Sequence, residues 1–520
     1  MPIRVVRDDD AVDEPQGPGR RGGGGGGGGI GALLPLILGL FGKNPKMAIL
    51  IVIVGAAIYF FKGGCNIGNL PGTDQQQSVL NTGAELDPEK FDNAEVYEPL
   101  AEVNTLPERV SLEQYCPPRL NQGQQGSCVA WSHAYAARSI LYSMQSGKSP
   151  EDCTFSPSFL YNQIKLEGCQ GAYIPNAMEK MQGQGLVPFS DFSYNDQDCS
   201  KQPGEDLKEK ASSFKIKGYQ RLTVGDASGF GKEKIDLIAI KQNLAQGAPV
   251  TIGMMVGGTF MQEMMGQEVW IPTDADYDMN GFGGHAMCVI GYDDYKAGGA
   301  FQIMNSWGPE WGQNGIAWVR YKDFEYFDKE AYGLYPMGKA NDVKFSINHL
   351  KASFGLLDNS SKQLIPLNHT SDISFRSSVA LQKGTSKFKI QVNNDAECYT
   401  YIFGLETDNS VKGLFPYTPK HSPYCGIMGT RIFPRDYSFQ PDETGTLDYF
   451  AIVVSKKALD YADYCTKLSK SSGSLQQKIT TVFGSQLLNA DYKATDTITF
   501  ETDDADENSV IAMIIEVEKK

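Results

Sequence analysis

Basic residues are scarce in this chain relative to acidic ones. Its 520 residues include 47 Lys and Arg against 62 Asp and Glu, a formal net charge of −15 at pH 7. Proteins that bind nucleic acid gather lysine and arginine to neutralise phosphates, so we expect no nucleic-acid partner. Histidine is scarcer still, with five in the whole chain. A catalytic or metal-binding imidazole must therefore be one of only five residues.

Cysteine is also sparse. Ten cysteines in 520 residues exclude a disulfide-dense scaffold but leave room for individual bridges. The length exceeds what one ordinary hydrophobic core serves, so two or three domains are expected.

The first 62 residues have an unusual composition. Residues 1–21 are polar and residues 22–29 are eight consecutive glycines. Each glycine loses the most backbone freedom on ordering, so we predict that residues 1–29 form a disordered tail. Two apolar runs follow at 30–42 and 47–61, separated by Lys-Asn-Pro-Lys. We interpret residues 30–62 as a membrane anchor, in which the second run forms an N-terminal transmembrane helix that spans about 22 Å of a hydrocarbon core of roughly 30 Å.

The charges around the second run predict its orientation. One lysine follows it directly, whereas four basic residues precede it: Arg20, Arg21, Lys43 and Lys46. The excess of positive charge on the cytoplasmic side predicts a cytoplasmic tail and an exported segment 63–520. The chain would then be a single-pass membrane protein with its domains in the periplasm or outside the cell. The first run leaves alternatives, since it can extend the anchor, lie in the interface, or form a hairpin that reverses this topology.

The stretch NQGQQGSCVAW, residues 121–131, places a thiol where a helix begins. Ser127 is a favourable N-cap, and residues 128–142 have helical periodicity. A thiol in the first turn sits at the positive end of the helix dipole, which stabilises the thiolate. Cys128 is therefore a candidate nucleophile, and the alternative is a small buried core cysteine.

One histidine is well placed to act as its base. His285 begins the apolar, β-branched run GGHAMCVIGYDD (283–294), and the run FQIMNSWGPEWGQNG (301–315) brings Asn305 to the end of a second strand. A carboxamide on a neighbouring strand can orient an imidazole, and Trp307 can shield their contact from water. Of the other histidines, His133 lies within the helix and is interpreted as packing.

Together these motifs resemble the papain-like cysteine peptidases. QGxxGSCxAW, GHAxxxxGY and NSWGxxWGxxG occur in the order of that family, over roughly residues 104–340. The resemblance implies an α+β catalytic domain of two lobes, one helical and one β-barrel-like. It makes Cys128 the nucleophile, His285 the base and later the acid, and Asn305 the residue that orients His285. Gln122 would donate its side-chain amide, with the Cys128 backbone N–H, to the oxyanion.

The resemblance also implies how polypeptide substrates bind. Trp307 and Trp311 would frame the Asn305 side and the leaving-group side of the groove, and Gly284 would also bind substrate. Main-chain binding would involve Gly171 and Ala172, although the family usually has a second glycine at the latter position. The implied reaction is attack of a thiolate–imidazolium pair on a peptide carbonyl, an acyl-thioester, and hydrolysis, without cofactor or metal.

Two departures from the family bear on disulfides and activation. Cys169 and Cys199 each lack the partner usual in the family, so they either pair with each other or remain unpaired. Residues 63–103 show no helical heptad pattern and are predicted to be a tether. Activation by removal of a pro-region is therefore not expected: either the enzyme is active once folded, or something else covers the groove.

An acidic loop, DADYDMNG (274–281), contains the first half of a calcium-binding pattern, but Met287 stands where the distal glutamate would be. We interpret it as an acidic loop leading to His285 and predict no metal site.

The C-terminal third, residues 341–520, has a different pattern. Period-two alternation at 387–392 and β-rich runs between turn residues predict an all-β, sandwich-like domain with a helical insertion at 456–488. The order of these runs resembles a bacterial accessory β domain of unknown role, which would make the source a bacterium.

Two functions compete with peptide hydrolysis. An acyl transferase would use the same thiol with an amine in place of water. A binding protein on the same scaffold would have lost a catalytic residue, whereas all four catalytic positions are filled here, which favours a hydrolase.

Overall fold

The computed structural model describes residues 3–8, 82–224, 234–336 and 348–520. The predicted membrane anchor, the rest of the tail and the tether up to residue 81 lie outside these ranges. No helix among the described residues has the length and apolar character needed to cross a bilayer.

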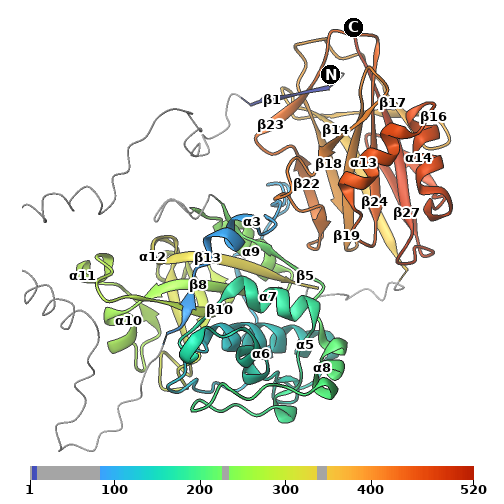
Figure 1. Ribbon diagram of the computed structural model, residues 1–520. Helices are drawn as coiled ribbons and strands as arrows, with labels where there is room; N and C mark the ends of the chain where they lie inside the picture. Colours follow the sequence, from blue (N-terminus) through green and yellow to red (C-terminus); the bar gives the residue numbers. More distant parts are fainter. Residues whose placement is uncertain (1–2, 9–81, 225–233, 337–347) are drawn as a thin grey trace, which may run out of the picture. The chain divides into compact units, whose positions relative to one another are not determined.

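The helical lobe of the first large domain is built around one long helical run. It begins as α4 (Cys128–Ala130), continues with π-helical geometry as η3 (Trp131–Arg138) and ends as α5 (Ser139–Ser146). Gly147, at φ 66°, ends the run in the left-handed conformation that glycine adopts without cost. Figure 1 shows α6 and α7 beside it. The further helices of the lobe are η4 (Pro150–Cys153), α6 (Pro157–Ile164), η5 (Glu167–Cys169), α7 (Ile174–Gly183), η6 (Phe189–Asp191), α8 (Glu205–Ala211) and η7 (Ser212–Phe214).

The β lobe is an eight-stranded sheet. Its order is β5-β13-β8-β10-β11-β12-β9, with β3 paired to β10. The bounds are β3 (Arg109–Ser111), β5 (Gly218–Arg221), β8 (Val250–Val256), β9 (Val269–Trp270), β10 (Gly283–Asp293), β11 (Ala300–Met304), β12 (Ile316–Arg320) and β13 (Asp328–Tyr335). Short elements complete it: β6 (Thr223–Val224), β7 (Lys234–Ile235), α9 (Leu237–Ala245), α10 (Gly258–Gln262), α11 (Asp274–Tyr277), η8 (Lys296–Gly298) and α12 (Tyr321–Phe327).

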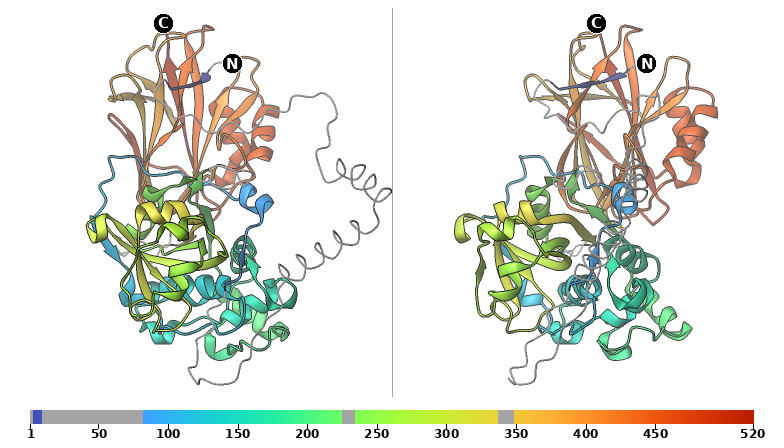
Figure 2. Two further views of the ribbon diagram at one scale, coloured as in Figure 1. Left: turned by 90° about the vertical axis from the view of Figure 1, so that its left-hand side faces the viewer. Right: turned by 60° about the vertical axis from the view of Figure 1, so that its left-hand side comes forward.

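The two lobes share one hydrophobic core, which positions the site. Helix residues such as Ala134 and Ile140 belong to the same buried cluster as Val289 and Ile303 of the sheet. In both views of Figure 2 the cyan helices and the green-to-yellow strands form distinct halves of this domain. The two-lobed α+β architecture expected from the sequence is therefore present.

The C-terminal domain consists of two packed sheets. The first has the order β1-β23-β18-β14-β26-β25 and the second β16-β17-β27-β24-β19-β20, with β15, β22 and β21 paired at their sides. Buried side chains of both sheets, such as Phe354, Ile390, Ile452 and Ile515, form its core. The first sheet comprises β1 (Ile3–Arg7), β14 (Leu350–Asp358), β15 (Leu364–Ile365), β18 (Phe388–Asn394), β22 (Gly429–Phe433), β23 (Tyr437–Pro441), β25 (Tyr492–Ala494) and β26 (Ile498–Thr502). The second comprises β16 (Leu367–Ser371), β17 (Ser374–Ser377), β19 (Cys398–Leu405), β20 (Val411–Phe415), β21 (Tyr424–Cys425), β24 (Leu447–Ser455) and β27 (Val510–Glu518).

Two helices cover the outer face of the second sheet, as the predicted insertion at 456–488 required. They are α13 (Tyr461–Lys470) and α14 (Leu475–Phe483), followed by the short turn η9 (Gly484–Gln486). Ile479 and Phe483 pack in one cluster with Tyr401 and Val453 of the strands. Figure 1 shows the two helices on one side of this sheet, where α14 packs on β24 and β27 and α13 packs on β20.

The N-terminal strand β1 differs from the expected disordered tail. Ile3–Arg7 pairs antiparallel with β23 of the C-terminal domain, from Ile3 opposite Pro441 to Arg7 opposite Tyr437, as Figure 1 shows. Asp8, at the end of the strand, is buried and its carboxylate lies 2.5 Å from the ammonium of Lys389. Residues 3–8 are therefore ordered on the C-terminal domain.

The expected tether is also wrong for its described part. Residues 84–85 form strand β2, residues 88–93 form helix α3, and Phe91 is fully buried. Asp87 caps α3 by accepting from the Lys90 N–H, with Pro88 in the first turn. This segment is part of the folded body because it can bury apolar side chains, which a solvated tether does not.

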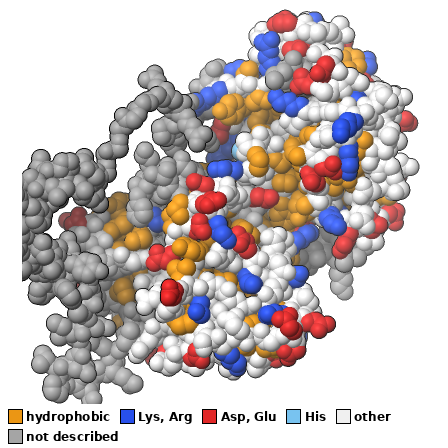
Figure 3. Space-filling view, viewed as in Figure 1, with side chains coloured by type: hydrophobic (Ala, Val, Ile, Leu, Met, Phe, Trp, Pro, Cys, Tyr) orange, Lys and Arg blue, Asp and Glu red, His pale blue; other side chains and the backbone are white. Residues whose placement is uncertain are grey.

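Charges of both signs are interspersed on the surface. Figure 3 shows Lys and Arg side chains mixed with Asp and Glu over the visible face. On this face the acidic residues that give the chain its net charge of −15 lie among basic ones.

Candidate active site

Cys128 stands at the start of the long helical run, where the sequence placed it. It is fully buried, and its Sγ accepts a hydrogen bond from the Ala286 N–H at 3.4 Å. Ala286 follows His285 on β10, so this bond ties the thiol of the helical lobe to the strand that carries the base. Ser127 differs from expectation because its side chain caps no helical N–H. Its hydroxyl lies 2.6 Å from the hydroxyl of Tyr194 instead.

His285 and Asn305 are in direct contact. His285 Nε2 lies 2.8 Å from Asn305 Oδ1, which also accepts the Ser306 N–H at 2.7 Å. Because that oxygen can only accept, the neutral imidazole carries its hydrogen on Nε2 and presents a lone pair at Nδ1. Nδ1 has no hydrogen-bond partner among the described residues. The arrangement is that of a base whose proton-accepting atom is kept available.

Two tryptophans enclose this pair. The ring of Trp307 stacks on that of His285 with centroids 4.3 Å apart and an interplanar angle of 21°. Trp311 packs edge-to-face against Trp307, and its indole N–H donates to the Phe260 carbonyl at 3.1 Å. Both tryptophans are almost completely buried. They keep water from the His285–Asn305 bond, which strengthens that bond and fixes the ring plane.

Gln122 is held in place by its own hydrogen bonds. Its Oε1 accepts from the Ser306 hydroxyl at 2.6 Å, its Nε2 donates to the Gln125 carbonyl at 3.0 Å, and its backbone N–H donates to the Ser306 carbonyl at 2.8 Å. These contacts connect the loop before Cys128 to the residue after Asn305. The role of Ser306 was not anticipated, since a serine in a strand end has no distinctive pattern.

Burial controls the charge of the two reactive groups. It raises the pKa of the Cys128 thiol from 9.0 to about 12, against the smaller lowering effect of hydrogen bonds from backbone N–H groups, including that of Ala286. It lowers the pKa of His285 from 6.5 to about 4, against the opposing effect of the bond to Asn305. Both shifts favour the neutral forms, because a charged pair in this buried site would lose its hydration.

The cover is residues 82–85. The Gly83 N–H donates to the Gly284 carbonyl at 3.1 Å and the Gly83 carbonyl accepts from the Ala172 N–H at 2.9 Å. From there β2 (Ala84–Glu85) runs parallel to β4 (Ala172–Tyr173). This segment thus occupies the backbone positions that the sequence analysis assigned to substrate, and Ala172 binds a main chain despite its methyl group.

Glycines on both walls permit this close approach. A Cβ on Gly284 would lie 2.1 Å from the Ala84 carbonyl oxygen, and one on Gly171 would lie 2.7 Å from that of Gly83. Gly83 itself has φ +151°, and a Cβ there would lie 2.4 Å from the Gly126 carbonyl oxygen. Sequence reasoning missed this segment, although Asp87-Pro88-Glu89 is a recognisable helix start.

The disulfide that the sequence left open is present. Cys169 and Cys199 are bonded to each other, with Cα atoms 6.1 Å apart and a sequence separation of 30. Cys169 directly precedes the groove residues, so the bridge anchors that wall.

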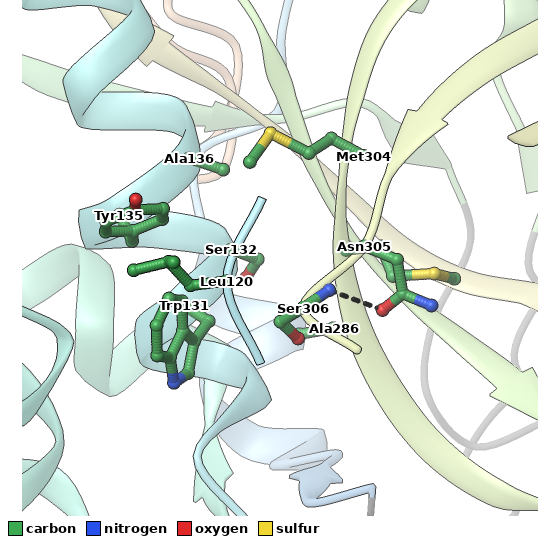
Figure 4. Close-up of a pocket in the computed structure, with 10 residues that line it drawn as sticks. Leu120, Trp131, Ser132, Tyr135, Ala136, Ala286, Met304, Asn305 and Ser306 are labelled. Atoms are coloured by element: carbon green, nitrogen blue, oxygen red, sulfur yellow. Dashed lines mark hydrogen bonds between the residues drawn. The ribbon is translucent and has the colours of Figure 1, made fainter. Parts of the chain in front are cut away.

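A small cavity of about 10 Å³ lies behind the site, between the lobes. In Figure 4, Trp131, Tyr135 and Ala136 of the helix face Met304 and Asn305 at the strand end. Asn305 Nδ2 has no partner among the described residues. A cavity of this size holds about one water molecule.

The acidic loop has a structural role. Asp276 of α11 is buried, and its carboxylate accepts from the backbone N–H and hydroxyl of both Thr259 and Thr273. No grouping of three or more metal-ligating side chains occurs among the described residues.

Comparison with known proteins concerns the part of the chain that holds this site. Residues 106–335 match the model of the papain family of cysteine proteases. An uncharacterized peptidase C1-like protein of Acanthamoeba polyphaga mimivirus is 28% identical over 230 residues, 43% of this chain and 68% of that protein. Cathepsin K of Mus musculus is 28% identical over 257 residues, 48% of this chain and 70% of that protein.

Solved structures include a match to xylellain, a cysteine protease from Xylella fastidiosa. It is 24% identical, covers 51% of this chain and 98% of that chain, and has a TM-score of 0.39.

Proposed function

We propose that this chain is an endopeptidase that uses Cys128, His285 and Asn305. Residues 106–335 match the model of the papain family of cysteine proteases, which is a family of hydrolases. The observation that carries the proposal is the joint placement of the thiol against β10 and of His285 against Asn305. A non-catalytic scaffold has no need for a base oriented with its accepting nitrogen unpaired.

The mechanism starts when a polypeptide replaces residues 82–85 in the groove. His285 Nδ1 takes the proton of Cys128, and Sγ attacks the peptide carbonyl carbon. The Cys128 backbone N–H and the Gln122 amide receive the developing oxyanion, an effect typically worth about 2.7–4 kcal/mol per donor. His285 then gives its proton to the leaving amine, and an acyl-thioester remains. Water, deprotonated by His285, hydrolyses the thioester and restores the thiol.

The test uses the full chain with the groove opened by Gly83→Val, because a side chain at this position collides with the Gly126 carbonyl. An epoxysuccinyl thiol reagent should add once to this variant, by intact mass, and the variant should hydrolyse casein. Cys128→Ala in the same background should do neither, whereas Cys153→Ala, which removes another buried thiol, should do both. Absence of an adduct on folded Gly83→Val would mean that Cys128 is inert and would favour a binding scaffold.

We further propose that both domains lie outside the cytoplasm of a bacterium, attached through residues 30–62. The Cys169–Cys199 bridge supports an oxidising compartment, and the pairing of β1 with β23 supports an anchor that enters and leaves on one side. In intact spheroplasts, added protease should digest both an N-terminal and a C-terminal tag. Protection of one tag alone would contradict this topology.

A further inference from the structure

The C-terminal β domain contacts the chain segment that leads out of the groove. Residues 95–104 follow α3, the helix after the groove-covering residues 82–85. The Val96 N–H donates to the Lys420 carbonyl at 2.7 Å, and the Ala101 N–H donates to the Thr430 carbonyl at 2.7 Å. Both acceptors belong to the loops and strands around β21 and β22. The β domain therefore supplies backbone partners to this segment at two places.

Side chains reinforce the contact. Asn104 Nδ2 donates to the Thr430 carbonyl at 2.8 Å and Asn104 Oδ1 accepts the Thr430 N–H at 3.0 Å. Arg431, itself buried, donates through Nε to the Glu98 carbonyl at 3.2 Å. Ser422 donates to the Glu95 carboxylate at 2.5 Å. Each end of the segment is thus bonded to the β domain.

The same segment is bonded to the catalytic domain on its other side. The Tyr97 N–H donates to the Arg221 carbonyl at 2.9 Å. Gln242 Oε1 accepts the Leu100 N–H at 2.9 Å, and Gln242 Nε2 donates to the Leu100 carbonyl at 2.9 Å. Residues 95–104 are therefore held between the catalytic domain and the β domain. Loss of either domain removes about half of the hydrogen-bond partners of this segment.

The two domains also meet directly. Gln246 at the end of α9 donates to the Met428 carbonyl at 2.5 Å and accepts the Met428 N–H at 2.8 Å. Gln220 of β5 donates to the Tyr424 carbonyl at 3.0 Å. Docking of the β domain and retention of the segment consequently depend on one interface.

We propose that the C-terminal β domain regulates the protease of its own chain: when docked, it clamps residues 95–104 and so holds residues 82–85 in the groove. This inference rests on the proposed function of the groove. Undocking removes the clamp, and the covering residues then exchange with substrate without any bond of the chain being cut. The β domain thereby has a function that needs no catalytic residue.

Two full-chain variants test the clamp, and both leave the groove unchanged. Asn104→Ala removes the two side-chain bonds of the segment to Thr430 and leaves the backbone bond from Ala101. Gln246→Ala weakens docking without touching the segment. Labelling of Cys128 by the epoxysuccinyl reagent should be faster than in the wild type by about tenfold in each, since each variant loses two or more hydrogen bonds of modest net strength. The Val96 and Ala101 amides should exchange hydrogen faster as well.

A matched control and a reference variant separate the outcomes. Asp506→Ala loses two bonds within a turn of the β domain and should label like the wild type. Gly83→Val gives the labelling rate of Cys128 when the groove is open. If Cys128 is labelled rapidly in Gly83→Val but at the wild-type rate in both test variants, the segment stays in place without the β domain and the clamp is refuted. If all opened variants label but none hydrolyses casein, the clamp stands and the proposed hydrolysis fails. If Asn104→Ala does not fold, Gln246→Ala decides alone.

Discussion

At the scale of single residues, the hydrogen bond between Asn305 and His285 is expected to contribute to the rate of hydrolysis. Asn305 Oδ1 lies 2.8 Å from His285 Nε2, and in the proposed reaction the imidazole becomes cationic. A hydrogen bond to a charged group contributes about 1.5–3 kcal/mol. In the Gly83→Val background, Asn305→Ala should therefore lower kcat by roughly 10- to 150-fold with little change in KM. Steady-state hydrolysis of a peptide substrate measures both constants, and an unchanged kcat would remove Asn305 from the mechanism.

His133 gives a pH dependence of stability that is separate from catalysis. It is fully buried in the long helical run, and burial lowers its pKa from 6.5 to about 4 against the bond to the Val129 carbonyl. Between pH 6.5 and pH 4, His133 therefore binds a proton in the unfolded chain but not in the folded chain. This stability is fully present above pH 6.5 and is lost as the pH falls toward 4, by about 3 kcal/mol at pH 4.

The measurement compares urea unfolding of the wild type and His133→Gln at pH 7 and pH 4. The wild type should lose about 3 kcal/mol more than the variant between these values. Equal losses would show that His133 is already protonated in the folded state. Carboxyl groups such as Glu330, whose pKa burial raises to about 8, cancel because both proteins contain them.

Among the elements, β1 shows what a short strand can add to a sheet edge. Its Asp8 carboxylate pairs with Lys389 and accepts from the Ser438 hydroxyl at 2.6 Å and from Asn359 at 3.0 Å. Removing one partner of a buried pair leaves the other charge uncompensated, which costs about 3–5 kcal/mol.

Asp8→Ala should therefore lower the free energy of unfolding of the β domain by about 3 kcal/mol or more and speed hydrogen exchange along β23. Val5→Ala is the control, because Val5 lies on the same strand and is 52% exposed. An Asp8→Ala protein as stable as the control would show that β1 is not part of the domain in solution.

At the scale of the whole molecule, the Cys169–Cys199 bridge constrains a 30-residue separation. Closing a loop of this size stabilises a fold by about 3–4 kcal/mol through the entropy of the unfolded chain. The double variant Cys169→Ser/Cys199→Ser should unfold at correspondingly lower urea. Cys465→Ser, which removes an unbridged and half-buried thiol, should match the wild type. Equal midpoints for all three proteins would contradict a structural role for the bridge.

Local sequence patterns determine the positions of many helices and strands in this protein. The helical run after Cys128 and the strands carrying His285 and Asn305 follow from periodicity and flanking residues, which act over a few positions in sequence. The sandwich and its helical insertion follow from the same rules. The motifs around Cys128, His285 and Asn305 predicted the papain-like family, whose model matches residues 106–335.

Only the tertiary structure decided what covers the thiol, and with it the burial that shifts the pKa values of Cys128 and His285. Residues 82–85 have no marked periodicity, and their place depends on glycines at 171 and 284 that approach from distant parts of the chain. Likewise β1 is ordered by a partner strand more than four hundred residues away. Contacts between such distant segments leave no local pattern, because the chain-closure cost is met by burial and hydrogen bonding that exist only after folding.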